Sequence, residues 1–205
     1  MATNILMRNP LPSHVLVMLL STLLIVSMLR TPLATASSTK DYENYIQTAC
    51  KPTLYRKLCY QSLSPYALKI KGDPQTLCKT ALTITLQAAR NASSTISKQL
   101  KQKGLTKLEG QVIEDCDSNI KDSIDELQQS LNAMKLLSGP DRAFQLDNIK
   151  TWVSAALTDD TTCTDEFDQE GQEVRATIKN TIRNMVSNIA QMTSNALALI
   201  NNQLK

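Results

Sequence analysis

Apolar residues recur at intervals of three and four along most of this chain. An α-helix returns to the same face every 3.6 residues, so this spacing predicts amphipathic helices. One stripe, about seven turns long, lies in the last segment: Val174, Ile178, Ile182, Met185, Ile189, Met192, Ala196 and Leu199. The segment from Lys107 to Leu137 carries a similar stripe: Val112, Cys116, Ile120, Ile124, Leu127, Leu131 and Met134.

Two further long helices are predicted from their end signals. One runs from Asp73, a capping residue followed by proline, to about Lys103. The other follows a Ser-Gly-Pro turn, with Asp141 placed to cap it, and runs through Ala156 toward Thr158.

The pattern predicts an all-α fold. No strand-like alternation is sustained, and an amphipathic helix cannot bury its own stripe, so residues 73–205 are expected to form an up-down four-helix bundle. Ahead of it, residues 37–72 hold shorter helical pieces broken by Pro52 and Pro65. These pieces predict an N-terminal helical hairpin appended to the bundle.

The first 36 residues differ from the rest. Arg8 stands without any acid, Val15 to Leu29 is an apolar run, and residues 34–36 (Ala-Thr-Ala) form a small-x-small cleavage site. This is the pattern of a secretory signal peptide over residues 1–36, ahead of one domain over residues 37–205. A membrane anchor is the alternative, but the run is shorter than the roughly 20 residues of a spanning helix. We expect a secreted protein without membrane contact after cleavage.

Composition excludes several classes of function. The chain has 22 basic and 19 acidic residues; removing residues 1–36, with two bases and no acid, leaves 20 − 19 = +1 and no footprint for nucleic acid. The single histidine, His14, is removed as well, which excludes Ser/His and Cys/His nucleophiles and most zinc sites. Five glycines are too few for a phosphate-binding loop. No metal or cofactor is expected.

All five cysteines lie beyond residue 36, where an oxidising compartment favours disulfides. Five is odd, so at least one thiol is left over. Cys50 and Cys59 flank a proline, and a local bridge between them would contribute roughly 2 to 3 kcal/mol. Cys78 and Cys116 lie inside predicted helices and Cys163 just past the end of one. Spacing does not choose which of the two pairs with Cys163.

Asp159 and Asp160 raise the question of catalysis. A two-carboxylate catalyst needs acids whose environments drive their pKa values apart, usually with one of them buried. These two stand at a predicted helix end among threonines, so we interpret them as solvated acids of a polar turn that help end the helix. A Ser or Thr nucleophile would have no histidine as its base. No catalytic residue is predicted.

The helix that bears Cys116 carries an acidic face. At about 100° per residue, Asp115, Asp122, Asp125 and Glu126 fall within about 100° of one another, clear of the apolar stripe. Such a set is usually a solvated helix face. A protein-binding surface is the alternative.

Four stretches resemble the plant invertase and pectin methylesterase inhibitor family. ACKPTLYRKLCYQSLSPYA resembles its opening, IEDCDSNIKDSIDELQQS its helix with the third paired cysteine, and WVSAALTDDTTCTDEF the segment with the fourth. TSNALALIN is similar to its last helix, particularly in the pectin methylesterase branch. The resemblance implies a four-helix bundle with an N-terminal hairpin. One departure is the stretch Thr164 to Phe167, where many members read Leu-Asp-Gly-Phe.

The resemblance also implies the cysteine pairing. The expected disulfides are Cys50 with Cys59 and Cys116 with Cys163. Cys78 is then a free thiol, expected to be buried on its helix.

The function implied by the resemblance is inhibition of pectin methylesterase. The chain is then not an enzyme: it covers the active-site cleft of a cell-wall esterase in a 1:1 steric complex, in the apoplast. Asp122 and Asp125 match the family's enzyme-contacting positions after Cys116, and Thr162 matches the contact threonine before the fourth cysteine.

Two other functions stay open. Inhibition of acid invertase is the nearer one, although the Pro-Lys-Phe triplet typical of many invertase inhibitors is missing. A secreted bundle that carries an apolar ligand is the remote one. Independently of these, Asn91 begins the one Asn-x-Ser/Thr sequon after residue 36 and is a predicted glycosylation site.

Overall fold

The computed structural model describes residues 14, 18, 31–169 and 173–204, without the side chains of 31–37 and 169. The predicted signal peptide over residues 1–36 therefore lies mostly outside the described residues. The chain divides into two compact units, Met1–Asp41 and Tyr42–Lys205. Helix α2 (Thr31–Ala49) belongs partly to each, and everything below concerns the second unit.

The second unit is helical along most of its length. After α2 come α3 (Arg56–Leu63), the 3₁₀ turn η1 (Ser64–Tyr66), α4 (Ala67–Ile70), α5 (Pro74–Leu100), α6 (Lys107–Met134), α7 (Arg142–Gln169) and α8 (Ala176–Gln203). No strand occurs in the described part of the chain, so the predicted all-α fold class is confirmed. None of the helices described there combines the length and the apolar character of a membrane span.

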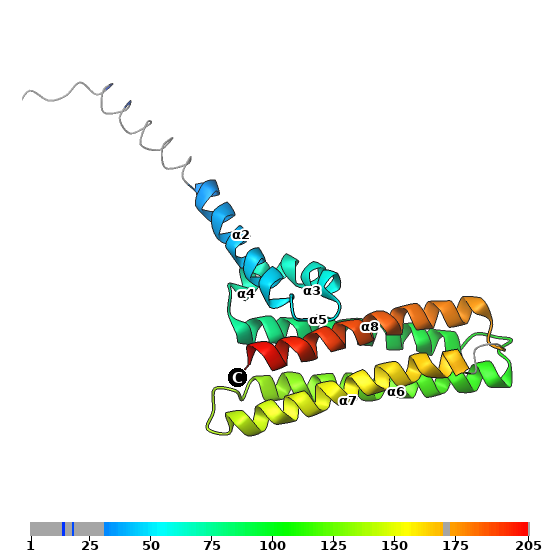
Figure 1. The fold of residues 1–205 in the computed structure, drawn as a ribbon. Coiled ribbons are helices and arrows are strands. Elements are labelled where there is room, and N and C mark those ends of the chain that lie inside the picture. The colour runs from blue at the N-terminus through cyan, green and yellow to red at the C-terminus, as the bar shows by residue number, and fades with distance from the viewer. Residues whose placement is uncertain (1–13, 15–17, 19–30, 170–172, 205) are drawn as a thin grey trace, which may run out of the picture. The chain divides into compact units, whose positions relative to one another are not determined.

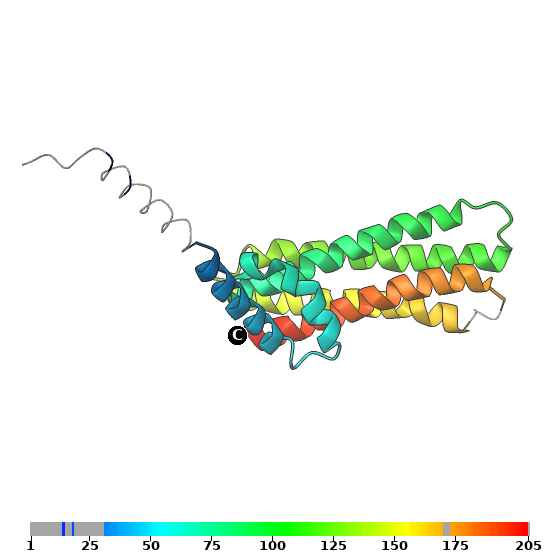
Figure 2. The same ribbon diagram turned by 90° about the horizontal axis from the view of Figure 1, so that it is seen from above.

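The four long helices α5 to α8 lie side by side, and α3 and α4 lie against them (Figures 1 and 2). Each long helix packs on the one before it in the chain, and α8 also packs on α5, so that the four close a ring. Short connections make consecutive helices antiparallel, which is the predicted up-down bundle. The hairpin pieces are appended through α3, which packs on α5 and α8.

Capping residues fix where two of the long helices begin. Asp73 caps α5 as predicted, and its Oδ2 accepts a hydrogen bond from the backbone N–H of Thr76 at 2.6 Å. Helix α6 begins with a capping box, in which Thr106 and Glu109 each accept from the other's backbone N–H. The loop before it contains Gly104 at a φ of 80°, a conformation that glycine adopts without strain.

The apolar core forms two clusters along the bundle. The first joins the hairpin to one half of the bundle through residues such as Ile46, Leu82 and Ile149; the second contains Cys116 and Phe167. Ile124 packs against both clusters. Most of the predicted stripe residues are buried in these clusters. Burial of this apolar surface is the main stabilising contribution, at about 25 cal/mol per Å².

The third bundle helix is longer than predicted. Helix α7 continues to Gln169, well past the expected end near Thr158. It continues because Cys163 and Phe167 extend its buried face with helical spacing. The threonine hydroxyls of this stretch donate to backbone carbonyls about one turn back, so they are paired within the helix. The predicted polar turn at Asp159 and Asp160 is therefore wrong, and Cys163 lies inside a helix.

Candidate functional site

A disulfide joins the middle of α6 to α7. Cys116 and Cys163 are bonded, with their Cα atoms 4.5 Å apart. On the same side of the helices, Asn119 Nδ2 donates to Glu166 Oε1 at 3.2 Å. From the Cys116–Cys163 bond to the Ser123–Asp160 hydrogen bond, residue numbers rise along α6 while those of the partners fall along α7, as in an antiparallel pair. The surface where the helices meet beside it, which we call the α6/α7 seam, comprises Asp115, Asn119, Asp122, Glu126, Asp159, Thr162 and Glu166.

A pair of carboxyl groups lies at the centre of the seam. Glu126 of α6 and Asp159 of α7 are both half-buried and lie close enough for a hydrogen bond between their carboxyl groups once one of them is protonated; the buried Glu126 Oε2 has no other partner among the described residues. Burial, followed by this hydrogen bond and the charge of Asp159, raises the pKa of Glu126 to about 7. Burial also raises the pKa of Asp159, which the hydrogen bond from Glu126 partly offsets. Two carboxyl groups this close share one proton, so the charge of the seam changes near neutral pH.

Glu166 is the third half-buried acid of the seam. Its Oε2 atom is buried and has no hydrogen-bond partner among the described residues, while Oε1 accepts from Asn119. Burial and then the charge of Asp115 raise the pKa of Glu166. An acceptor without a donor is costly in a monomer. A partner that brings a donor to this seam would remove that cost.

The structure places the three residues predicted for partner binding on or beside the seam. Asp122, Asp125 and Thr162 are all exposed. Asp122 stands one turn from Glu126 along the same row and acts electrostatically on Asp159. Thr162 stands between Asp159 and Glu166 on α7, and its hydroxyl donates to the Thr158 carbonyl at 2.9 Å. Asp125 points further outward, away from the core face of α6.

Asp160, the neighbour of Asp159, is fully buried instead. Its Oδ1 accepts from Ser123 Oγ of α6 at 2.8 Å, and its Oδ2 accepts from Thr193 Oγ1 of α8 at 2.7 Å. Burial raises its pKa to about 7, against the two hydroxyl hydrogen bonds, which lower it. Asp160 thus links three helices from inside the bundle. With 0% exposure it is unreachable for a substrate, whereas the sequence predicted a solvated acid.

A second buried acid lies at the start of α6 and has a cationic partner. Glu109 is fully covered, and Arg175 Nε donates to its Oε1 at 2.7 Å. The hydrogen bonds from Arg175 and from the Thr106 backbone lower the pKa of Glu109 to about 2. The Arg175 side chain is itself 49% exposed, so this pair lies close to the surface.

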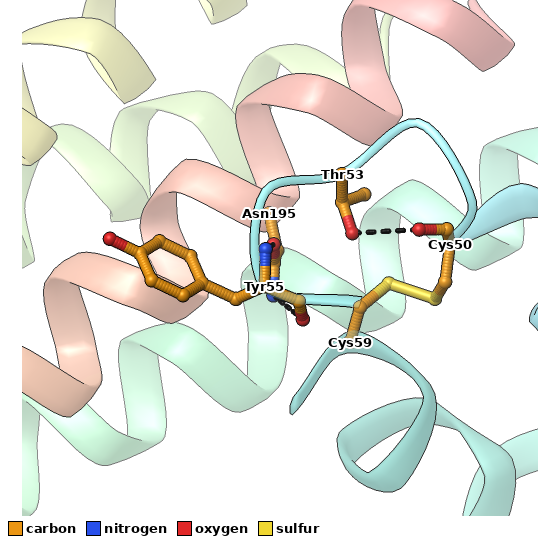
Figure 3. Close-up of a disulfide and its surroundings, with 5 residues drawn as sticks. All are labelled: Cys50, Thr53, Tyr55, Cys59 and Asn195. Atoms are coloured by element: carbon orange, nitrogen blue, oxygen red, sulfur yellow. Dashed lines mark hydrogen bonds between the residues drawn. A yellow bond between two sulfur atoms is a disulfide. The ribbon is translucent and has the colours of Figure 1, made fainter. Parts of the chain in front are cut away.

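The other disulfide closes the loop between α2 and α3. Cys50 and Cys59 are bonded, with Cα atoms 5.8 Å apart, and Thr53 Oγ1 donates to the Cys50 carbonyl at 2.8 Å (Figure 3). Both disulfides join the cysteines that the family resemblance pairs. Cys78 is the free cysteine and is buried, and burial raises the pKa of its thiol to about 12.

Asn195 anchors this loop to the bundle. Its Oδ1 accepts from the Tyr55 backbone N–H at 3.1 Å, and its Nδ2 donates to the Tyr55 carbonyl at 3.0 Å (Figure 3). The side chain lies on α8 and is only 4% exposed. Sequence reasoning missed this residue; the available signal was a polar amide next to the apolar stripe of the last helix.

Two other sequence predictions fall on well-defined positions. Asn91 is exposed on α5, and its Oδ1 accepts from Gln87 one turn earlier at 3.0 Å. The apolar space between α3, α5 and α8, lined by residues such as Leu63 and Ile84, has a volume of about 10 Å³. That is room for about one water molecule. An apolar ligand therefore does not fit this space.

The family model described as plant invertase/pectin methylesterase inhibitor matches residues 44–199. The chain belongs to this family. The match spans α3 to α8 almost completely, and it includes the α6/α7 seam and both disulfides.

Similar proteins include two that are named pectinesterase inhibitors. A carrot (Daucus carota) protein named 21 kDa protein is 42% identical over 170 residues, covering 82% of this chain and 87% of that protein. Pectinesterase inhibitor 10 of Arabidopsis thaliana is 42% identical over 161 residues, covering 77% and 50%. Pectinesterase inhibitor 11 of the same plant is 37% identical over 187 residues, covering 89% and 91%. The two Arabidopsis relatives are named as inhibitors of an enzyme.

Solved structures of the inhibitor family share the fold. The crystal structure of mutant form A of a pectin methylesterase inhibitor from Arabidopsis aligns with a TM-score of 0.64 at 19% identity, covering 78% of this chain and 97% of that one. A second crystal structure, of a pectin methylesterase inhibitor from Arabidopsis thaliana, aligns with a TM-score of 0.55. At this identity the likeness concerns the fold alone.

Proposed function

We propose that this protein inhibits pectin methylesterase by binding the enzyme through the α6/α7 seam. The observation that carries the proposal is the acidic, disulfide-fixed seam in a chain whose relatives are named pectinesterase inhibitors. Asp122, Asp125 and Thr162 are the proposed contacts. All three side chains are accessible to a partner on this side of the bundle.

The proposed mechanism is steric. The bundle covers the substrate cleft of the enzyme in a 1:1 complex and thereby keeps the pectin chain out, while no bond is made or broken by the inhibitor. A rigid surface loses little conformational entropy on binding. The Cys116–Cys163 bond and the buried Asp160 hydrogen bonds support such rigidity directly beneath the seam.

The remaining parts of the proposal concern processing and place. Residues 1–36 act as a cleaved signal peptide, and residues 37–205 form the inhibitor domain, with the hairpin over 37–72 and the bundle over 73–205. The mature protein works in the cell wall. Asn91 is a proposed glycosylation site, and its exposure on α5 is compatible with an attached glycan.

Titration of the mature protein into pectin methylesterase and acid invertase assays tests the proposal. We expect stoichiometric inhibition of pectin methylesterase. Because seam carboxyl groups titrate near neutral pH, the affinity is expected to change between pH 5 and 8. If the protein inhibited neither enzyme, the proposal would be overturned. Equal affinity across this pH range would show that the ionisable groups of the seam do not contribute to binding.

Acid invertase is the second candidate target, because the matching family model covers inhibitors of both enzymes. Inhibition of invertase without inhibition of pectin methylesterase would reassign the target and keep the inhibitor function.

A further inference from the structure

A basic groove lies on the side of the molecule that carries the disulfide-closed loop. It has a volume of about 520 Å³ and is open to solvent. Its lining is Leu54, Tyr55, Arg56, Lys57, Leu58, Gln61 and Gln191. The set holds two cations, two amides, two leucines and one aromatic ring, and it contains no acid.

The charge around this groove is unbalanced over a wider region. Residues 42–72 contain five bases (Lys51, Arg56, Lys57, Lys69 and Lys71) and one acid, Glu43, so their net charge is 5 − 1 = +4. Arg56 and Lys57 are exposed, and neither takes part in any of the ion pairs found among the described residues. Their charges are therefore available to an anionic partner.

The groove is also built on a fixed backbone. The Cys50–Cys59 bond closes the loop, and Asn195 holds both backbone polar groups of Tyr55, the residue just before Arg56 (Figure 3). The Tyr55 ring points away from the disulfide (Figure 3). Because the loop is held in place before any ligand arrives, binding would cost little ordering of the backbone.

We propose that this groove binds a polysaccharide chain whose sugar units carry free carboxylates. Cations match the carboxylates, the amides can hydrogen bond to hydroxyl groups, and Tyr55 with the leucines offers apolar surface to the sugar rings. The demethylated product of pectin methylesterase has this chemistry, so the choice of ligand rests on the proposed function. Binding there would hold the inhibitor on polymer that the enzyme has already processed.

The test measures binding of the mature protein to short oligogalacturonates by calorimetry, with the same oligomers fully methyl-esterified as the comparison. We expect binding to the acidic oligomers alone, with an affinity that falls as salt is added. Chemical shift changes in NMR spectra should gather at residues 54–61 and at Gln191. Equal binding to the esterified oligomers, or binding to neither, would overturn the proposal.

Charge-matched variants separate the groove from general attraction. In R56Q/K57Q the affinity should fall by about tenfold or more, because both groove cations are lost. In K98Q/K101Q, which removes two exposed lysine charges at the C-terminal end of α5, outside the groove lining, the affinity should change by less than about twofold. An equal loss in both variants would show non-specific attraction and contradict the proposal. Thermal unfolding of each variant verifies that it is folded.

Two further measurements show which of the two proposals, the groove or the inhibitor function, has failed. R56Q/K57Q should still inhibit pectin methylesterase. If the wild type bound the oligomers but did not inhibit the enzyme, the proposed function alone would be overturned. If the protein bound vesicles of phosphatidylserine and phosphatidylcholine but not the oligomers, the groove would be a membrane-binding site. That result would overturn the proposal that it binds a polysaccharide.

Discussion

Asp159 and Asp160 are neighbours in the chain, yet α7 sends them to two different surroundings. Asp159 lies half-buried at the α6/α7 seam beside Glu126 of α6 and helps to raise the pKa of that carboxyl group. Asp160 lies in the core and accepts hydrogen bonds from Ser123 and Thr193. A step of one residue turns a helix by about 100°, which is enough to separate a group available to a partner from one that holds three helices together.

The largest expected effect comes from removing the Cys116–Cys163 disulfide, which fixes α6 against α7. The double variant C116A/C163A should lower the free energy of unfolding by about 4 kcal/mol, because the bond spans a sequence separation of 47. Urea denaturation of the variant and the wild type measures this difference. A loss as small as that expected for an exposed side chain would mean that packing alone holds α6 and α7 in register.

The same substitution at the two neighbouring aspartates tests the comparison directly. D160A should cost about 2 to 3 kcal/mol, since it leaves a small cavity and removes the acceptor of the Ser123 and Thr193 hydroxyls. D159A should cost less than about 1 kcal/mol, because its site reaches solvent. Equal costs in urea denaturation would contradict the assignment of one acid to the core and the other to the surface.

The pH dependence of stability separates Asp160 from Glu109. Asp160 has a pKa of about 7 in the fold and about 4 when unfolded, so the folded chain holds the extra proton and stability falls as pH rises from 4 to 7. Glu126, with its raised pKa, adds to the same slope. Glu109 has a pKa of about 2, so its contribution is present above about 4.5 and is lost as pH falls toward 2.

Two substitutions isolate these contributions. D160N should remove much of the fall in stability between pH 4 and 7, and E109Q should remove part of the loss below about 4.5. Both are measured as urea midpoints against pH. An unchanged slope in D160N would show that Asp160 titrates in the fold as it does in the unfolded chain.

The difference between the two aspartates also shows what the sequence could predict. The all-α bundle, the Asp73 cap and the apolar stripes followed from local spacing and end signals. The burial of Asp160 did not follow from these signals, because a carboxylate among threonines is typical of a helix end. The spacing of Ala156, Asp160, Cys163 and Phe167 does continue a helical face. The continuation of the helix was missed because Asp160 stands at a position of this face where an apolar residue is expected.

The seam depends on information that a single helix does not contain. Asp122 and Asp125 were predicted on an acidic face of α6, and that face is present. The pairing of Glu126 with Asp159 depends on the register between α6 and α7, and spacing left the partner of Cys163 undecided. The cationic partner of Glu109 lies 66 residues away in the chain, so no local pattern reveals it.

Inhibition by a seam double variant is the most direct test that the α6/α7 seam binds pectin methylesterase. D122A/D125A is titrated into the esterase assay beside D147A/E173A, which removes two exposed acids away from the seam. We expect the inhibition constant to rise by about tenfold or more in the first variant and by less than about twofold in the second. Equal inhibition constants for the two variants would contradict binding through the seam.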